Sequence, residues 1–136
     1  MDCIFCKIIK AELPAKKVYE DRRFLAILDI NPINKGHVLV LPKEHYDNLT
    51  DTPVDVVKDL IAVIKNLCPA VVESSGGEGF NLILNNGRVA GQLIEHLHWH
   101  IIPRLKNDNL HPWPGKQYQE GEMDNYAKRI INTLKD

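Results

Sequence analysis

The stretch His96-Leu97-His98-Trp99-His100-Ile101-Ile102-Pro103 places a histidine at every second position of an apolar run. Successive side chains of a β-strand point to opposite faces, so a strand here puts His96, His98 and His100 on one face, roughly 6–7 Å apart. Imidazole is the only side chain whose ordinary pKa lies close to neutrality, so three of them can supply a nucleophile, an acid and a metal ligand. We expect this strand to carry the chemistry of the protein.

Two other interpretations of the histidine row stay open at this point. In the first, the histidines have only a structural role. Three half-polar rings would then lie where a core favours hydrocarbon, so a structural role is less favoured than a chemical one. Alternatively, all three histidines could bind one metal ion, as they do in some zinc hydrolases. The nearest carboxylates are Glu95 and Asp108, and Glu95 points to the opposite face of the predicted strand. No acidic ligand therefore follows at a suitable spacing.

Length and charge limit the class of protein. The chain has 136 residues, which fits one domain with a full hydrophobic core. Its net charge of −1 favours small-molecule partners over nucleic acid or anionic membranes. No apolar stretch approaches the roughly 18–20 residues that span a bilayer, and the first residues do not resemble a signal peptide. We therefore expect a cytoplasmic protein.

The cysteines add a possible metal site. Cys68 falls within a helical pattern and is expected to be a small buried residue. Cys3 and Cys6 form a C-x-x-C pair, which in a reducing compartment indicates half a zinc site or a redox pair. A redox pair is expected between a strand and a helix, whereas this pair opens the chain, so zinc is favoured. Its two further ligands must come from the six histidines.

The polarity pattern predicts mostly strands. Short apolar runs, rich in branched residues and bounded by Gly, Pro or Asn, predict strands at 18–20, 24–29, 37–41 and 80–84, followed by the histidine strand. A short helix is predicted near residues 4–9, and an amphipathic helix at about 123–134 could pack on its own domain or on a neighbouring subunit. This order favours an antiparallel α+β fold.

One long helix is predicted between the strands. Thr52 is expected to cap it, with Pro53 at its first position. Its apolar residues recur at helical spacing and predict one buried face, made by Val57, Leu60, Ile61, Ile64 and Cys68. Pro69 lacks a donor for the carbonyl four residues earlier and is expected to kink or end the helix.

The histidine row belongs to a longer pattern. Gly91-Gln92 and Asn85 precede it, and Gly36–Lys43 reads Gly-His-Val-Leu-Val-Leu-Pro-Lys. From about Cys3 to Arg104 the chain resembles the histidine triad (HIT) nucleotide hydrolases and transferases, and it is similar to their Hint-like branch. The resemblance implies a HIT-like α+β fold with a five-stranded antiparallel sheet, one long helix and usually a homodimer. It also implies a single HIT domain over residues 1–136, with a core at about 3–104 and an extension at 105–136.

The resemblance also implies a reaction. Hint-like enzymes act on nucleoside 5′-monophosphates that carry an amine or another small group on phosphorus. His98 matches their nucleophile, whose neutral ring attacks the α-phosphorus and forms a nucleotidyl-histidine. His100, one pleat further along, is placed to donate a proton, which typically contributes ~10²–10⁴ in rate. His37 matches a further histidine that supports the nucleophile.

Other positions match the nucleotide contacts of the family. Asn85 and Gln92 match amides that contact phosphate, although a turn or loop surface would also explain them. Asp29 matches the carboxylate that accepts from the ribose hydroxyls. Apolar residues that resemble the base pocket are equally suited to a core; they are Ile4, Phe5, Ile8, Ile27 and Ile30. One departure is Leu93, because Hint-like enzymes commonly carry Ser or Thr there, near the leaving group.

Some bacterial-type members of the family hold a structural zinc ion with two cysteines and two histidines. The matching residues here are Cys3, Cys6, His45 and His96, a closed tetrahedral set with no open position for substrate. Such a site can supply on the order of 10 kcal/mol of folding free energy. An unmetallated cysteine pair is the alternative.

These observations together predict a cytoplasmic, dimeric hydrolase that cleaves the bond between the α-phosphorus of a purine nucleotide and its substituent, through His98. A hydrolase of dinucleoside polyphosphates is the enzymatic alternative, because the same nucleophile serves. A zinc-stabilised nucleotide-binding module without turnover is the other alternative. Zinc is expected to be structural, and no cofactor is expected in the chemistry itself.

Overall fold

The computed structural model describes residues 2–134; Met1, Lys135 and Asp136, which the predicted single domain includes, lie outside the described residues. Five strands form one sheet in the order β1-β2-β3-β5-β4, and every neighbouring pair is antiparallel. The predicted fold class is therefore confirmed. The elements are α1 (Ile4–Ile9), β1 (Lys17–Glu20), β2 (Phe24–Leu28), β3 (Val38–Pro42), α2 (Val54–Ser75), β4 (Gly79–Leu84), the 3₁₀ turn η1 (Arg88–Ala90), β5 (Trp99–Arg104) and α3 (Glu122–Leu134).

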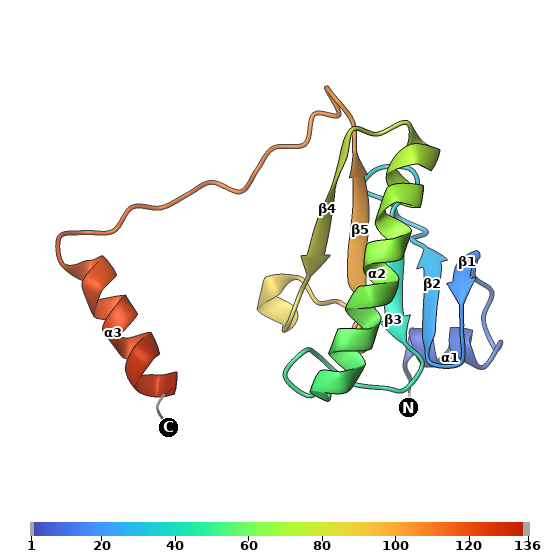
Figure 1. The fold of residues 1–136 in the computed structure, drawn as a ribbon, viewed down its shortest axis with the longest axis horizontal. Coiled ribbons are helices and arrows are strands. Elements are labelled where there is room, and N and C mark those ends of the chain that lie inside the picture. The colour runs from blue at the N-terminus through green and yellow to red at the C-terminus, as the bar shows by residue number, and fades with distance from the viewer. Residues whose placement is uncertain (1, 135–136) are drawn as a thin grey trace.

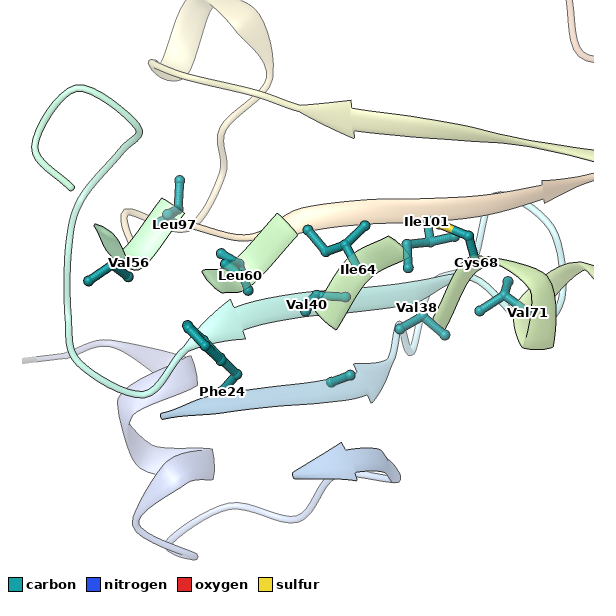
Figure 2. Close-up of a cluster of buried hydrophobic side chains, with 11 residues drawn as sticks. Phe24, Val38, Val40, Val56, Leu60, Ile64, Cys68, Val71, Leu97 and Ile101 are labelled. Atoms are coloured by element: carbon teal, nitrogen blue, oxygen red, sulfur yellow. The ribbon is translucent and has the colours of Figure 1, made fainter. Parts of the chain in front are cut away.

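The two faces of the sheet are covered by different helices. Helix α2 runs along one face, and α1 lies at the lower end of β2 and β3 (Figure 1). The core under α2 combines helix residues such as Leu60 and Ile64 with Val40, Leu97 and Ile101 from the sheet side (Figure 2). A second core lies under α1; its members are Cys3, Phe5, Ile8, Leu25, Ile27, Leu39 and Leu41. The alternation along β2 and β3 thus divides their buried side chains between two layers.

Helix α2 differs from the prediction at both ends. Pro53 precedes its first residue, and the hydroxyl of Thr52 donates to the carbonyl of Asn48, 2.7 Å away, so Thr52 does not cap the helix. The helix also continues past Pro69 to Ser75. Cys68 and Val71, on either side of Pro69, are both buried on the sheet. Packing of this kind outweighs the loss of one backbone hydrogen bond, a net contribution of about 1 kcal/mol.

The buried face of α2 is rotated slightly from the predicted one. Leu60, Ile64 and Cys68 are buried as expected, but Ile61 is 37% exposed and Val56 is buried in place of Val57. The helix ends at Gly76, whose φ of 71° lies in the left-handed region that favours glycine.

The histidine row begins before its strand. Strand β5 starts at Trp99, so only His100 lies within the ladder, opposite Leu39 of β3 and Ile83 of β4. The chain bends at residues 94–96 before it reaches the strand, and Leu97 N–H donates to the carbonyl of Tyr46 at 2.7 Å. The predicted sidedness still holds, because Leu97 packs under α2 while His96 and His98 both contact Phe5 of α1.

The chain after β5 leaves the sheet. An extended segment runs from the top of β5 to α3, which lies apart from the sheet (Figure 1). Asp108 holds the first part of this segment, because its two carboxylate oxygens accept from Arg104 at 2.7 and 2.9 Å. No side chain of α3 is buried. Among residues 2–134, none of the helices has the length and apolar character needed to cross a membrane.

Candidate active site and metal cluster

A pocket of about 580 Å³ opens on the α1 side of the sheet. Its apolar wall includes all five residues that the resemblance assigns to base binding: Ile4, Phe5, Ile8, Ile27 and Ile30. His37, His98 and His100 line the same pocket, together with Asp29. Helix α1, the end of β2 and the start of β5 therefore bring the predicted catalytic and base-binding residues to one cavity.

The two nitrogens of the His98 ring differ: one is hydrogen-bonded within the protein, and the other has no hydrogen-bond partner among the described residues. Its Nδ1 atom lies 2.6 Å from the carbonyl oxygen of His96, so Nδ1 carries a proton and donates it. In the neutral ring Nε2 is then an unprotonated acceptor. The residue is only 7% exposed, and this burial lowers the pKa of His98 below its ordinary value. The structure thus holds a neutral imidazole with an available lone pair beside the pocket, which is the form that attacks phosphorus.

His37 and His100 form a hydrogen-bonded chain that fixes both tautomers. Ile33 N–H donates to Nδ1 of His37 at 3.1 Å, so the proton of a neutral His37 resides on Nε2. That Nε2 atom lies 2.9 Å from Nδ1 of His100, which must then accept. The proton of His100 is therefore on Nε2. Because burial lowers the pKa of His100 to about 4, this ring stays neutral and serves as a hydrogen-bond donor near neutral pH.

Asp29 supplies the negative charge of the pocket. One carboxylate oxygen accepts from Asn31 N–H at 2.8 Å, and the other lies 3.7 Å from Nε2 of His37. Asp29, His37 and His100 are close enough to suggest a metal site. However, Nε2 of His37 carries the proton of the chain above and has no lone pair for an ion. We therefore describe these three residues as a hydrogen-bonded group.

The two predicted phosphate amides are placed differently from the histidines. Gln92 is buried, and its amide bonds to the protein itself: it accepts from Gly87 N–H at 2.9 Å and donates to the carbonyls of Asp47 and Ile94. Asn85 also stands outside the residues that line the pocket. Nearby Gly91 has a φ of +95°, which favours glycine and turns the chain, and a Cβ there would lie 3.5 Å from Nδ2 of Asn85, an ordinary contact distance.

Several lining residues were not singled out from sequence. Leu39 follows His37 by two positions on β3 and shares its face, a relation that strand alternation alone could have indicated. Leu13, Pro14 and Ala15 reach the pocket from the loop after α1, where no sequence signal marked them. Leu93, noted as a departure from the family, lines the pocket with 83% of its surface exposed.

The four predicted metal ligands form a second cluster. Cys3 Sγ lies 3.4 Å from Nδ1 of His96, and Cys6 Sγ lies 3.3 Å from Nδ1 of His45 and 3.6 Å from that of His96. The two Nδ1 atoms are 3.1 Å apart. Tetrahedral zinc, with bonds of about 2.0–2.1 Å to nitrogen and 2.3 Å to sulfur, places its ligand atoms about 3.3–3.8 Å from one another. The spacing therefore fits one ion.

The hydrogen bonds around this cluster also fit a cation. Nε2 of His96 lies 2.8 Å from the carbonyl of Pro42, and Nε2 of His45 lies 2.8 Å from a carboxylate oxygen of Asp47. Both Nε2 atoms therefore donate, and each neutral ring turns an Nδ1 lone pair toward the other. Two lone pairs at 3.1 Å repel each other unless a cation lies between them. Burial also lowers the pKa of His96 to about 4, which keeps its ring neutral.

The fold and the two sites define a class: an antiparallel α+β domain with a histidine-lined pocket beside a two-cysteine, two-histidine cluster. A sequence model of the HIT domain matches residues 10–107, and the chain therefore belongs to the HIT domain family. The predicted family is confirmed.

Curated relatives include proteins with named activities. An uncharacterized HIT-like protein of Methanocaldococcus jannaschii is 49% identical over 90% of both chains. An adenosine 5′-monophosphoramidase of Schizosaccharomyces pombe is 42% identical over 99% of this chain and 100% of its own. An adenylylsulfatase of Arabidopsis thaliana is 41% identical over 98% of this chain and 68% of its own.

Solved structures share the fold over almost the whole chain. A protein from Streptococcus mutans superposes with a TM-score of 0.90 at 34% identity, covering 99% of this chain and 86% of its own. A zinc-bound histidine triad family protein from Mycobacterium smegmatis gives a TM-score of 0.77 at 36% identity, covering 100% of this chain and 99% of its own.

Proposed function

We propose that the protein is a nucleotide hydrolase that cleaves the bond between the α-phosphorus of a purine nucleotide and an amine substituent, with His98 as the nucleophile. The observation that carries the proposal is that two histidines with complementary nitrogens line one pocket. His98 has an unprotonated Nε2, and His100 has a protonated Nε2. A nucleophile and a proton donor on one face are what a two-step transfer requires. Relatives named as an adenosine monophosphoramidase and an adenylylsulfatase support a nucleotide substrate.

The proposed reaction proceeds in two steps. In the first, Nε2 of His98 bonds to the α-phosphorus and the phosphorus–nitrogen bond breaks, while Nε2–H of His100 donates a hydrogen bond to the departing nitrogen, which leaves as the neutral amine with a proton taken from solvent. In the second, water attacks phosphorus and gives its proton to solvent, and the bond to His98 breaks to release the nucleoside monophosphate. During the first step the carbonyl of His96 accepts from Nδ1 of His98 and stabilises the charge that develops on this ring.

The pocket supports a nucleotide in a defined orientation. The base would lie against Phe5, Ile8 and Ile27, and the ribose hydroxyls would donate to Asp29 near the mouth. We propose Asn85 as a phosphate contact after a rearrangement of its loop. Gln92 is proposed to act indirectly. Its amide already bonds to Gly87 N–H and to the carbonyl of Asp47, so it stabilises the loop that follows Asn85 and does not bind phosphate itself.

The experiment compares AMP release from adenosine phosphoramidate, adenosine 5′-phosphosulfate and diadenosine tetraphosphate. We expect turnover of the phosphoramidate, and a loss on the order of 10³-fold or more in His98→Ala. His111→Ala is the matched control, because His111 is an exposed histidine of the C-terminal segment. An acid-stable adenylyl group on a residue other than His98 would refute the proposed mechanism. Equal rates in His98→Ala and wild type would also refute it. AMP binding with no turnover of any substrate would instead favour a binding module.

We infer that the ion of the metal cluster is zinc, and that its role is structural. Two thiolates and two imidazoles form a closed tetrahedral set that zinc favours, and the relative from Mycobacterium smegmatis is zinc-bound. Elemental analysis should give one zinc per chain in wild type and none in Cys6→Ser. Because Cys3 and Cys6 are not joined in a disulfide, this proposal agrees with the predicted cytoplasmic location.

We propose a homodimer as the assembled form. Strand β4 is an edge of the sheet, and its Phe80 and Leu82 are 45% and 38% exposed. Helix α3 has 13 residues, a length that is marginal in isolation, and its Ile130 and Leu134 are 59% and 78% exposed. A second copy would cover both surfaces. Light scattering should give a dimer for wild type and a smaller species for Leu82→Lys; a monomeric wild type would refute the proposal.

A further inference from the structure

The nucleophile lies in a segment that the sheet does not hold. His98 precedes the first paired residue of β5, Trp99. The segment before it is joined to its surroundings by the bond from Leu97 N–H to the carbonyl of Tyr46, at 2.7 Å. The position of His98 therefore depends on the loop that carries Tyr46 as well as on the sheet.

That loop and the histidine segment both carry ligands of the metal cluster. His45 directly precedes Tyr46, and Asp47, which accepts from Nε2 of His45, directly follows it. On the other side, His96 contributes Nδ1 to the cluster with its side chain, while its carbonyl accepts from Nδ1 of His98. One residue thus belongs to the cluster through its ring and contacts the nucleophile through its backbone.

Helix α1 gives a second connection between the cluster and His98. Phe5 lies between the ligands Cys3 and Cys6 in the sequence and is 3% exposed. Its ring meets those of His96 and His98 edge to face, with centroids 5.7 and 4.9 Å apart. A shift of α1 therefore moves the ring that packs against the nucleophile.

We propose that the metal cluster positions the nucleophile: an ion held by Cys3, Cys6, His45 and His96 fixes the carbonyl of His96, and thereby the ring plane and the Nδ1–H tautomer of His98. The proposal rests on the function proposed above. It gives the metal cluster, whose ligand set is that of a structural site, an indirect effect on catalysis. His45 and Phe5 are then positioning residues, one through the Tyr46 loop and the other through ring packing.

Loss of the ion has a defined physical effect. The two Nδ1 lone pairs, 3.1 Å apart, then repel each other, so the 45–47 loop and the histidine segment separate. The bond of 2.6 Å from His98 Nδ1 to the His96 carbonyl lengthens, and the tautomer with Nε2–H becomes accessible. That tautomer has no lone pair facing the pocket. Because Asp29, Ile27 and Ile30 lie outside these segments, nucleotide binding is affected less than turnover.

The test uses His45→Ala, since His45 does not line the pocket. We expect this variant to lose the ion and to lower kcat about 10–100-fold, while KM changes less than about threefold. Protein labelled with ¹⁵N-histidine should show a single Nδ1–H signature for His98 in metal-loaded wild type and both tautomers in the variant. His45→Cys, which keeps four zinc-binding side chains, should recover the ion, the single tautomer and most of kcat.

Controls separate positioning from general destabilisation. Ile64→Val weakens the core on the other face of the sheet and should leave the ion, the His98 tautomer and kcat unchanged. If His45→Ala does not fold, Phe5→Leu in metal-loaded protein takes its place; because Phe5 also lines the base pocket, the readout is the His98 tautomer, and a full metal content with both tautomers is expected. A folded, metal-free protein with the wild-type tautomer, or a metal-loaded Phe5→Leu variant with the wild-type tautomer, would overturn the proposal. The nuclear magnetic resonance result needs no substrate, so it stands even if the proposed reaction is wrong.

Discussion

The Nε2 atom of His37 lies 2.9 Å from the Nδ1 atom of His100, and this contact decides which nitrogen of His100 carries a proton. Nδ1 of His37 accepts from Ile33 N–H, so its Nε2 must donate. A backbone amide in the loop between β2 and β3 thus determines, through two rings, that His100 presents Nε2–H to the pocket. No charged group is required for this proton donor.

Replacing His37 by leucine should therefore lower kcat about 10–100-fold, because Nδ1 of His100 loses its donor and either tautomer becomes accessible. Steady-state kinetics on adenosine phosphoramidate measure the effect. His37→Asn is the control, since its amide can still donate to His100, and it should retain more activity than His37→Leu. Equal rates in His37→Leu and wild type would show that the chain of hydrogen bonds has no catalytic role.

The pH dependence should show an acid limb below the ordinary histidine pKa of about 6.5. Burial lowers the pKa values of both His98 and His100, the latter to about 4, and the neutral ring of His98 is the nucleophile in the proposed reaction. Turnover should therefore persist as pH falls through 6.5 and disappear only as these lowered pKa values are reached. A profile of kcat/KM against pH measures this, with folding followed by circular dichroism. A half-maximum at about 6.5 would contradict the predicted shift.

Residue spacing predicted most of the strands, the one-sided histidine row and half of a zinc site, because strand alternation and helix periodicity are local properties; the resemblance to the family supplied the other site residues. His37, His98 and His100 were assigned to one pocket through the family pattern, and they line it together. The ends of α2 were missed, because Thr52 bonds back to Asn48 and because packing beyond Pro69 overrides a local helix breaker. Tertiary contacts of this kind leave no signal in spacing.

The hydrogen bonds of the site were also beyond sequence. The carbonyl of His96 accepts from Nδ1 of His98, and only the structure identifies this acceptor. Likewise, Gln92 reads as a phosphate ligand in the family pattern, whereas its amide bonds to Gly87 and Asp47 here. An amide near a loop can serve either purpose, and the choice depends on which backbone groups the fold brings near it.

Gln92→Ala tests these two roles. Removing a buried amide leaves Gly87 N–H and the carbonyl of Asp47 without their partner, so we expect a loss of about 1–3 kcal/mol in the free energy of unfolding. Urea denaturation measures this loss. Nucleotide affinity should fall less than it would on removal of a direct phosphate contact. Unchanged stability together with a strongly raised KM would instead identify Gln92 as a phosphate ligand.

A substitution at Leu93 tests whether this position contacts the leaving group. This side chain is 83% exposed and lines the pocket that also contains His98 and His100. Leu93→Ser adds a hydroxyl that can donate to a departing amine, so the rate with adenosine phosphoramidate should rise several-fold relative to substrates with an apolar amine substituent. The ratio of kcat/KM values for the two substrates is the measurement. An unchanged ratio would place Leu93 outside the leaving-group contact.

Removing a metal ligand should destabilise the fold in a way that a chelator reproduces. Cys6→Ser leaves His45 and His96 with facing lone pairs and leaves α1 joined to the sheet by its apolar contacts alone, so we expect the free energy of unfolding to fall by several kcal/mol, toward the roughly 10 kcal/mol that structural zinc can supply. Thermal unfolding with and without chelator measures the effect: the chelator should lower the Tm of wild type but leave that of Cys6→Ser unchanged. Cys68→Ala is the matched control, because Cys68 lies in the core under α2 and its loss should keep the sensitivity to chelator. A wild-type Tm that the chelator does not move would refute a stabilising ion at the cluster.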